Sequence, residues 1–103
     1  MLTDFYEKTT KKFDVTINYN GTAPNITQDT VTLVLKATKD GQAVLTKQAD
    51  VSTAGQSGIA KFNVSKTDTA IPYGKYYYEI YWTLSNGEEY VLAVGQVNIL
   101  NRV

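Results

Sequence analysis

The chain has 103 residues, with neither cysteine nor histidine, and its ten basic residues balance ten acidic ones. This length predicts one small domain with a single core. The composition excludes disulfides, thiolate chemistry and zinc sites built on Cys and His. The balanced charge argues against nucleic-acid binding, and no apolar run reaches the length that spans a bilayer.

Residues 1–12 are mostly polar, with Leu2, Phe5 and Tyr6 as the apolar points. Their spacing suits either one helical turn or an arm that docks on a neighbouring molecule. The segment has no apolar stretch typical of a secretory signal, so we expect a chain that is intracellular or assembled inside a cell. We expect an N-terminal arm over residues 1–12 and one folded domain over residues 13–103.

From Phe13 onward, apolar and polar residues alternate with the period of a half-buried strand. Turn-forming residues interrupt this pattern repeatedly. We expect about seven strands, among them those at 13–19, 30–37, 43–51, 59–64, 75–84 and 89–100. About seven short strands at such spacing predict an all-β, immunoglobulin-like antiparallel sandwich.

Two local features refine this prediction. The strand at 43–51 is the most polar, and Lys47 within it is typical of a sheet edge, where a charge discourages unwanted pairing. Between the next strands, Ser65 is placed to cap a short helical turn that Pro72 ends.

The stretch from Lys75 to Leu84 contains four tyrosines and the tryptophan. Its even-numbered positions are the more apolar, and the odd-numbered set includes Glu79, which is costly to bury without a partner. We therefore expect the even-numbered side chains to face the core. The others, Tyr77 and Tyr81 among them, face outward.

The turn at Asn86-Gly87 sets the register of the last two strands. A two-residue turn pairs Ile80 with Ala93, whereas a three-residue loop ending at a left-handed Gly87 pairs Trp82 with Tyr90, Ile80 with Leu92 and Tyr78 with Val94. The second register gathers the large apolar side chains on one face. We therefore predict the three-residue loop.

This arrangement leaves an aromatic patch on one sheet face, a feature typical of contact sites. Alternatively, the rings pack beneath the N-terminal arm or only favour the extended backbone. Seven residues are the candidate protein-interface positions: Leu2, Phe5, Tyr6, Tyr73, Tyr77, Tyr81 and Val91.

No catalytic motif, phosphate-binding loop or calcium-loop spacing occurs in the chain. We therefore expect no enzyme activity, no cofactor and no metal. Carbohydrate binding stays open as an alternative, because exposed tyrosines stack on sugars and Glu79, Thr83 and Asn98 offer polar groups.

Residues 27–100 resemble the Ig-like modules of tailed-phage virions, above all the N-terminal domain of baseplate upper proteins. The features that carry the resemblance are the Lys39-Asp40-Gly41 turn, Ile71-Pro72-x-Gly74, the Tyr76-x-Tyr78-x-Ile80 alternation, the Asn-Gly turn and Gly95-x-Val97-x-Ile99.

The resemblance implies a structural protein of the virion. A free-standing Ig-like domain is similar to the decoration, or cement, proteins of phage capsids. The expected partners are other virion subunits, such as the major capsid protein or tail proteins, with the chain itself forming a homotrimer on the particle. The alternative within this class is a tail, baseplate or fibre adaptor.

Overall fold

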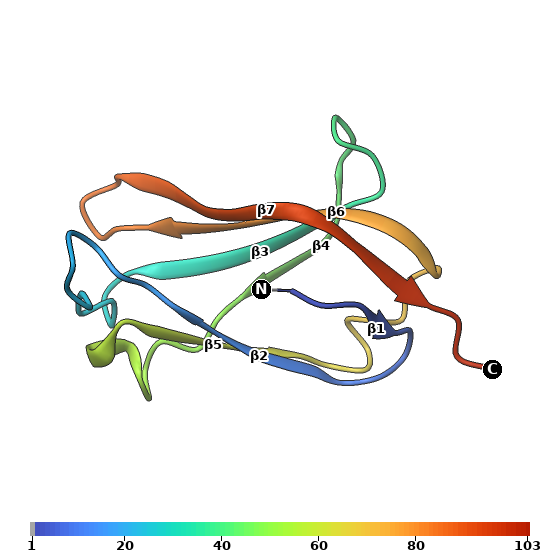
Figure 1. Ribbon diagram of the computed structural model, residues 1–103, viewed down its shortest axis with the longest axis horizontal. Helices are drawn as coiled ribbons and strands as arrows, with labels where there is room; N and C mark the ends of the chain where they lie inside the picture. The colour runs from blue at the N-terminus through green and yellow to red at the C-terminus, as the bar shows by residue number, and fades with distance from the viewer. Residues whose placement is uncertain (1) are drawn as a thin grey trace.

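In the computed structural model, which describes residues 2–103, the chain forms two β-sheets packed face to face (Figure 1). The strands are β1 (Phe5–Tyr6), β2 (Lys11–Thr16), β3 (Thr30–Lys36), β4 (Ala43–Gln48), β5 (Ile59–Val64), β6 (Gly74–Thr83) and β7 (Glu89–Leu100). A single 3-10 turn, η1 (Gly55–Ser57), precedes β5. The predicted all-β class is therefore confirmed.

The larger sheet has the strand order β1-β7-β6-β3-β4, and the smaller sheet pairs β2 with β5. Every pairing is antiparallel except that of β1 with β7, which is parallel. Over residues 2–103, no helix has the length and apolar character needed to cross a membrane.

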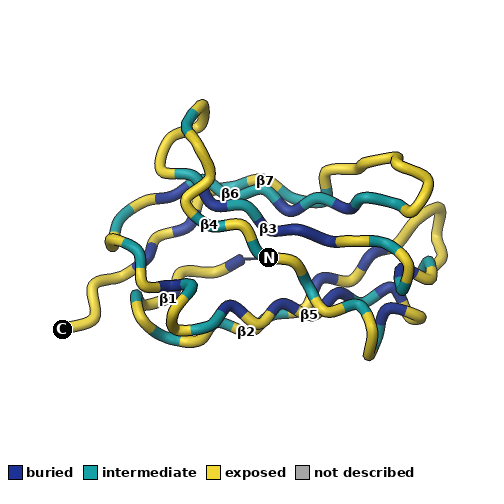
Figure 2. The backbone as a smooth tube through the Cα atoms, turned by 180° about the vertical axis from the view of Figure 1, so that it is seen from behind, coloured by how far each residue is buried: buried dark blue, intermediate teal, exposed yellow. Residues whose placement is uncertain are grey.

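The core lies between the two sheets, where the buried side chains of both layers meet (Figure 2). Alternation supplies it: Ala60, Phe62 and Val64 point inward from β5 and are buried. The rings of Phe13 and Phe62 stack at 4.9 Å within the small sheet. The larger sheet contributes β-branched and aliphatic side chains, notably Val31, Leu33, Leu35, Ile80, Val97 and Ile99.

The polar strand β4 forms one edge of the larger sheet, as its sequence predicts. Lys47 does more than protect that edge, because its Nζ lies 2.9 Å from Oδ2 of Asp68. Asp68 follows β5 of the smaller sheet, so this ion pair links the two layers. The Lys47 side chain and the Ser65 N–H both hold the pKa of Asp68 below its usual range.

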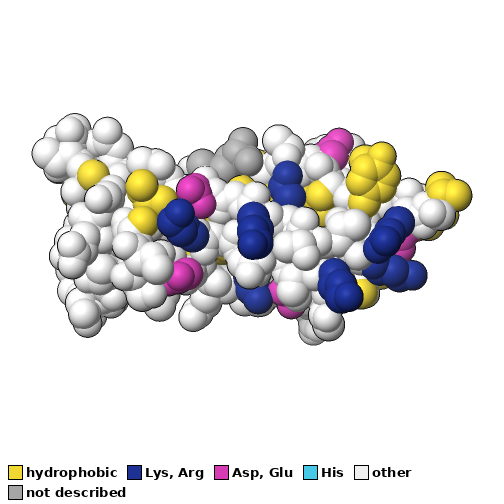
Figure 3. Space-filling view, turned by 90° about the horizontal axis from the view of Figure 1, so that it is seen from below, with side chains coloured by type: hydrophobic (Ala, Val, Ile, Leu, Met, Phe, Trp, Pro, Cys, Tyr) yellow, Lys and Arg dark blue, Asp and Glu magenta, His cyan; other side chains and the backbone are white. Residues whose placement is uncertain are grey.

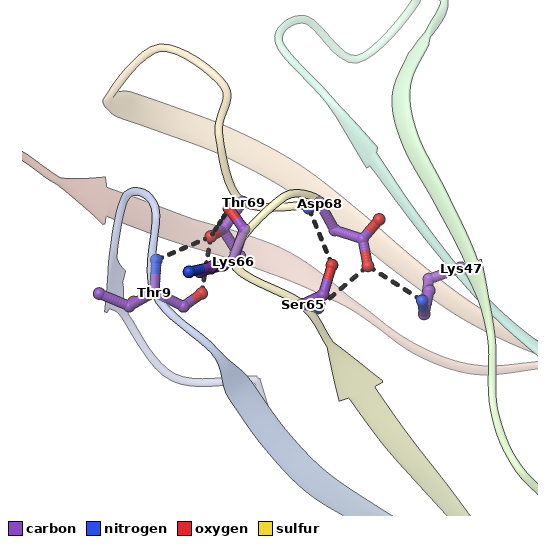
Figure 4. A network of polar contacts seen from close by, with 6 residues as sticks. All are labelled: Thr9, Lys47, Ser65, Lys66, Asp68 and Thr69. Atoms are coloured by element: carbon purple, nitrogen blue, oxygen red, sulfur yellow. Dashed lines mark hydrogen bonds and ion pairs between the residues drawn. The ribbon is translucent and has the colours of Figure 1, made fainter.

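Ser65 caps a short turn, as predicted (Figure 4). The N–H of Asp68 donates to Oγ of Ser65 at 3.1 Å, and the Asp68 carboxylate accepts the N–H of Ser65 at 3.0 Å. This is the reciprocal arrangement of a capping box. One helical hydrogen bond follows, from the N–H of Thr69 to the carbonyl of Ser65.

The predicted alternation along β6 is confirmed. Tyr76, Ile80 and Trp82 are buried between the sheets, while Tyr77 and Tyr81 lie on the opposite face and are partly exposed. The buried indole keeps a hydrogen-bond partner, since its N–H donates to Oδ2 of Asp29 at 2.9 Å. The other carboxylate oxygen of Asp29 accepts the N–H of Ser85, which fixes the base of the β6–β7 hairpin.

The three-residue hairpin loop is also confirmed. The N–H of Leu84 donates to the carbonyl of Glu88, and the N–H of Gly87 donates back to Leu84. Gly87 has φ +94°, the left-handed conformation that such a loop requires at its last position. The loop therefore pairs Trp82 with Tyr90.

From Ile80 onward the predicted pairing, Ile80 with Leu92 and Tyr78 with Val94, is wrong, because a β-bulge intervenes. Tyr81 pairs with Val91, but Ile80 pairs with Ala93, so Leu92 is the extra residue. From that point on, the odd-numbered residues of β7, rather than the even-numbered ones, lie opposite the core-facing residues of β6. Consequently Val94 lies opposite Glu79 and faces outward, whereas the register without a bulge places it in the core.

The N-terminal segment belongs to the sandwich. Leu2 and Phe5 lie in the core cluster, and β2 already begins at Lys11, within the stretch expected to be an arm. The side chain of Asp4 accepts the N–H of Asn98 at 2.9 Å and so satisfies the edge of β7. Apolar burial and this edge bond explain why the segment folds onto its own chain.

Replacing Gly58 with alanine is expected to destabilise the fold more than replacing Gly21. Both glycines have positive φ, which costs an L-residue about 1–2 kcal/mol. A Cβ at Gly58 would in addition lie 2.9 Å from the carbonyl oxygen of Ile17, whereas one at Gly21 meets nothing within 4 Å. Urea unfolding of Gly58→Ala and Gly21→Ala measures the difference, and equal losses would contradict the steric part of this account.

Candidate protein-interaction face

The larger sheet has a second face, which the smaller sheet does not cover. We call it the outer face and define it by the outward side chains of the three central strands. The cross-strand register gives three rows, each running from β3 through β6 to β7: Thr32, Tyr81 and Val91; Val34, Glu79 and Val94; Lys36, Tyr77 and Gln96.

The outer face is unusually apolar for a surface in contact with water. Val94 is 68% exposed and Val91 is 59% exposed. Tyr77, Tyr81 and Val34 lie beside them and are partly exposed. Scattered apolar residues are normal on a protein surface, but a contiguous group of this kind is typical of a contact site.

The opposite side of the molecule has a different character. The outward positions of β2 and β5 carry Lys12, Asp14 and Lys61, all exposed, and Figure 3 shows basic and acidic side chains spread along that side with apolar ones between them. Asp14 and Lys61 form an ion pair at 3.8 Å. The smaller sheet therefore presents a solvated surface, while the larger sheet presents tyrosine and valine.

The outer face is also hollowed. A depression of about 330 Å³ lies over β3, β6 and β7, with Tyr77, Glu79 and Val94 among its lining residues. Lys39 joins the lining from the β3–β4 turn, which stands up from the sheet in Figure 1 and bounds one end of the depression. We refer to this feature as the Tyr77 hollow. Its volume is at the lower end of the range for small ligand sites.

Two ammonium groups flank the ring of Tyr77. The Nζ atoms of Lys39 and Lys75 lie 5.7 and 5.5 Å from its centroid. Both distances fall within the range of a cation–π contact. These contacts hold the two lysine side chains beside the hollow.

Three of the predicted interface residues are strongly exposed: Val91 on the outer face, and Tyr6 and Tyr73 elsewhere. Tyr6 pairs with Leu100, and Gly74 pairs with Ile99, so Tyr6 and Tyr73 both flank the C-terminal end of β7. The structure therefore separates these two rings from the patch formed by Tyr77, Tyr81 and Val91.

Leu2 and Phe5, which were also predicted to lie at an interface, are not on the surface. They are buried in the core of their own chain, so neither is presented to a second molecule in this conformation. Buried Thr69 anchors the segment at its far end: its hydroxyl donates to the carbonyl of Thr9 at 2.6 Å and accepts the N–H of Thr9 at 3.0 Å (Figure 4). The N–H of Lys8 adds a bond to the carbonyl of Thr69.

Sequence reasoning did not find Val94 or the lysines around the hollow. A signal for Val94 exists, since the apolar positions of β7 are even-numbered at Tyr90 and Leu92 but odd-numbered at Val97 and Ile99. Such a change of parity indicates a bulge between them. The lysines carry no comparable signal, because their convergence depends on a turn rising over the sheet.

The polar residues considered for carbohydrate binding do not converge. Glu79 lies in the hollow, but Thr83 pairs with Glu89 near the hairpin, and Asn98 pairs with Lys75 near the start of β6. Eight residues of extended strand separate these two pairs, which is roughly 26 Å at the usual rise. Among residues 2–103, no group of three or more acidic side chains is placed to hold a metal ion.

A second aromatic cluster lies at the hairpin end of the sandwich. The ring of Tyr90 lies 5.7 Å from that of Trp82 and 5.9 Å from that of Tyr19. The Tyr90 hydroxyl donates to Glu88 at 3.0 Å. Hydrogen bonding with Tyr19 and then with the Glu88 carboxylate raises the pKa of Tyr90 to about 12, because both favour the protonated phenol.

Comparison of the chain with protein-family models, with curated proteins and with solved structures finds no match.

Replacing Thr69 with valine is expected to loosen the N-terminal segment. The variant keeps the shape of the side chain but leaves the N–H and carbonyl of Thr9 without their partner, which costs about 1–3 kcal/mol. Hydrogen exchange of the amides of residues 5–9 is expected to accelerate more than that of β6. Thr67→Val is the control, since Thr67 is exposed. Unchanged exchange at residues 5–9 would contradict the anchoring role.

Alkaline titration followed by tyrosinate absorbance is expected to show a late transition near pH 12 that Tyr90→Phe removes. Burial also raises the pKa of Tyr76, and that ionisation is expected to remain in the variant. Because the folded-state pKa lies above the ordinary value of about 10, the corresponding stabilisation is complete below that value and is lost as the pH rises to about 12. Glu88→Gln is expected to move the transition to lower pH. A difference titration in which Tyr90→Phe removes a group ionising near pH 10 would refute the assignment.

Proposed function

We propose that this protein is a non-enzymatic structural subunit of a phage virion, an Ig-like module that binds other virion proteins through the outer face. The observation that carries the proposal is the exposed group of tyrosine and valine on the uncovered side of the larger sheet. Large aromatic side chains with a polar tip are enriched in protein interfaces. A face of this kind gains stability when a second protein excludes water from it.

The strand arrangement supports the Ig-like assignment. In an immunoglobulin sandwich the third, sixth and seventh of the seven strands share one sheet, and the second and fifth share the other. Here β3, β6 and β7 are neighbours in the larger sheet, and β2 pairs with β5. Unlike the seven-strand constant type, β1 and β4 join the larger sheet.

The virion assignment rests on the resemblance of residues 27–100 to phage Ig-like modules. Within that class we propose a capsid decoration protein, present in many copies that stabilise the head shell. Repetition suits such a contact, because a modest affinity per subunit becomes strong when several copies of an assembly bind together. The competing role in the same class is a tail or baseplate adaptor.

Copy number separates the two roles. Quantitative mass spectrometry of purified particles is expected to find on the order of hundreds of copies per particle for a shell protein, and far fewer for a tail part. Absence of the chain from particles would overturn the virion proposal.

Replacing the outer-face residues tests the binding surface itself. Val91→Ser with Val94→Ser removes exposed apolar area without opening the core, and is expected to reduce incorporation into particles at least about tenfold. Tyr77→Ala with Tyr81→Ala is expected to do the same. Lys12→Ser with Lys61→Ser, on the opposite side of the molecule, is the matched control. Unchanged incorporation of both outer-face variants would exclude this face as the contact.

A further inference from the structure

The charges around the Tyr77 hollow are predominantly positive. Lys36 and Lys39 line it, and Lys75 lies against the Tyr77 ring from the other side. Glu79 is the one carboxylate in the lining. Asp40 follows Lys39 in the turn but is not part of the lining. Two ammonium groups therefore lie near the Tyr77 ring, and the hollow also has Lys36 and one carboxylate in its lining.

Within the described residues 2–103, none of these three lysines forms an ion pair. Among residues 2–103 the ion pairs are those of Lys47 with Asp68 and of Lys61 with Asp14. No side-chain hydrogen bond of Lys36, Lys39 or Lys75 occurs in the same part of the chain. Lys47 and Lys61 have a carboxylate partner elsewhere on the molecule, whereas the lysines at this hollow have only Glu79 among the acidic side chains of its lining.

We propose that the Tyr77 hollow binds an acidic segment of the partner protein, with a glutamate or aspartate side chain seated between the lysines and the Tyr77 ring. This inference rests on the proposed function, because it names the chemistry of the partner that contacts the outer face. Charge complementarity carries it: an incoming carboxylate supplies the counter-charge that the three ammonium groups lack.

The shape of the site agrees with this occupant. The hollow holds about 330 Å³, which suits one or two side chains and is small for a folded element. Val34 and Val94 form apolar sides on which the stem of such a side chain packs. Lys39 of the β3–β4 turn lines the hollow together with residues of the sheet, so ion pairs formed there are less screened than those on an open surface. The amide of Gln96 adds a donor at the rim.

The experiment is a titration of the labelled full chain with a blocked pentaglutamate peptide, followed by amide chemical shifts. We expect shifts confined to Lys39, Tyr77, Val94 and Gln96 and their neighbours. Affinity is expected to fall at least about tenfold near 1 M salt, where the screening length is about 3 Å. Lys39→Glu with Lys75→Glu is expected to abolish the shifts. Lys12→Glu with Lys66→Glu, a matched change of charge away from the outer face, is expected to preserve them.

Three outcomes would overturn the inference: no localised shifts, equal shifts with pentalysine, or shifts with free glucuronate but not with the peptide. The last would assign the hollow to an acidic sugar instead. The result is separable from that of the proposed function. If Val91→Ser with Val94→Ser reduces incorporation while Lys39→Glu with Lys75→Glu does not, the outer face binds the virion but its partner segment is not acidic.

Discussion

The arrangement of this protein depends on which alternate side chains of two neighbouring strands, β6 and β7, face the core. Along β6, every second side chain enters the core, so β7 must place its apolar residues opposite them. The sequence of β7 cannot do this with one unbroken alternation. Tyr90, whose ring lies against buried Trp82, and buried Val97 are on the same face of the sheet, although one position is even-numbered and the other odd-numbered. The bulge at Leu92 resolves the conflict by adding one unpaired residue. Both ends of β7 then face the core correctly.

The bulge also has a consequence on the other side of the sheet. By shifting the register it turns Val94 outward, next to Glu79 and close to Tyr77. It therefore contributes to the apolar character of the outer face. The bulge also lies in β7, whose edge opposite β6 is paired only with the short strand β1. A bulge in such an edge discourages uncontrolled pairing with other chains. One local irregularity thus serves the core, the outer face and the exposed edge.

The two surfaces of the sandwich differ in the side chains that they expose. The smaller sheet presents charged side chains to water, among them the Lys61–Asp14 pair, whereas the larger sheet presents tyrosine and valine. Burial of the N-terminal segment reinforces the difference, since Leu2 and Phe5 complete the core rather than extending away from it. The exposed apolar group and the Lys61–Asp14 ion pair therefore lie on opposite faces of the molecule.

Short-range features of this fold were predictable from the sequence. The alternation along β6, the loop at Gly87 and the cap at Ser65 each depend on residues within a few positions of one another. Strands β5 and β7 have the predicted bounds for the same reason. The change of parity within β7 was present in the sequence too, but a bulge is placed by the neighbouring strand and not by its own residues.

Only the tertiary structure decided where distant segments meet. The path of residues 2–9 depends on a space left between the sheets and on Thr69, sixty positions away from Thr9. The Tyr77 hollow needs Lys39 and Lys75, from a turn and a strand start that the sequence separates widely, to converge on one ring. Secondary-structure propensity and the alternation of apolar and polar residues depend on residues close together in the sequence. The outer face, in contrast, is formed by residues that are distant in the sequence and meet only in the folded structure.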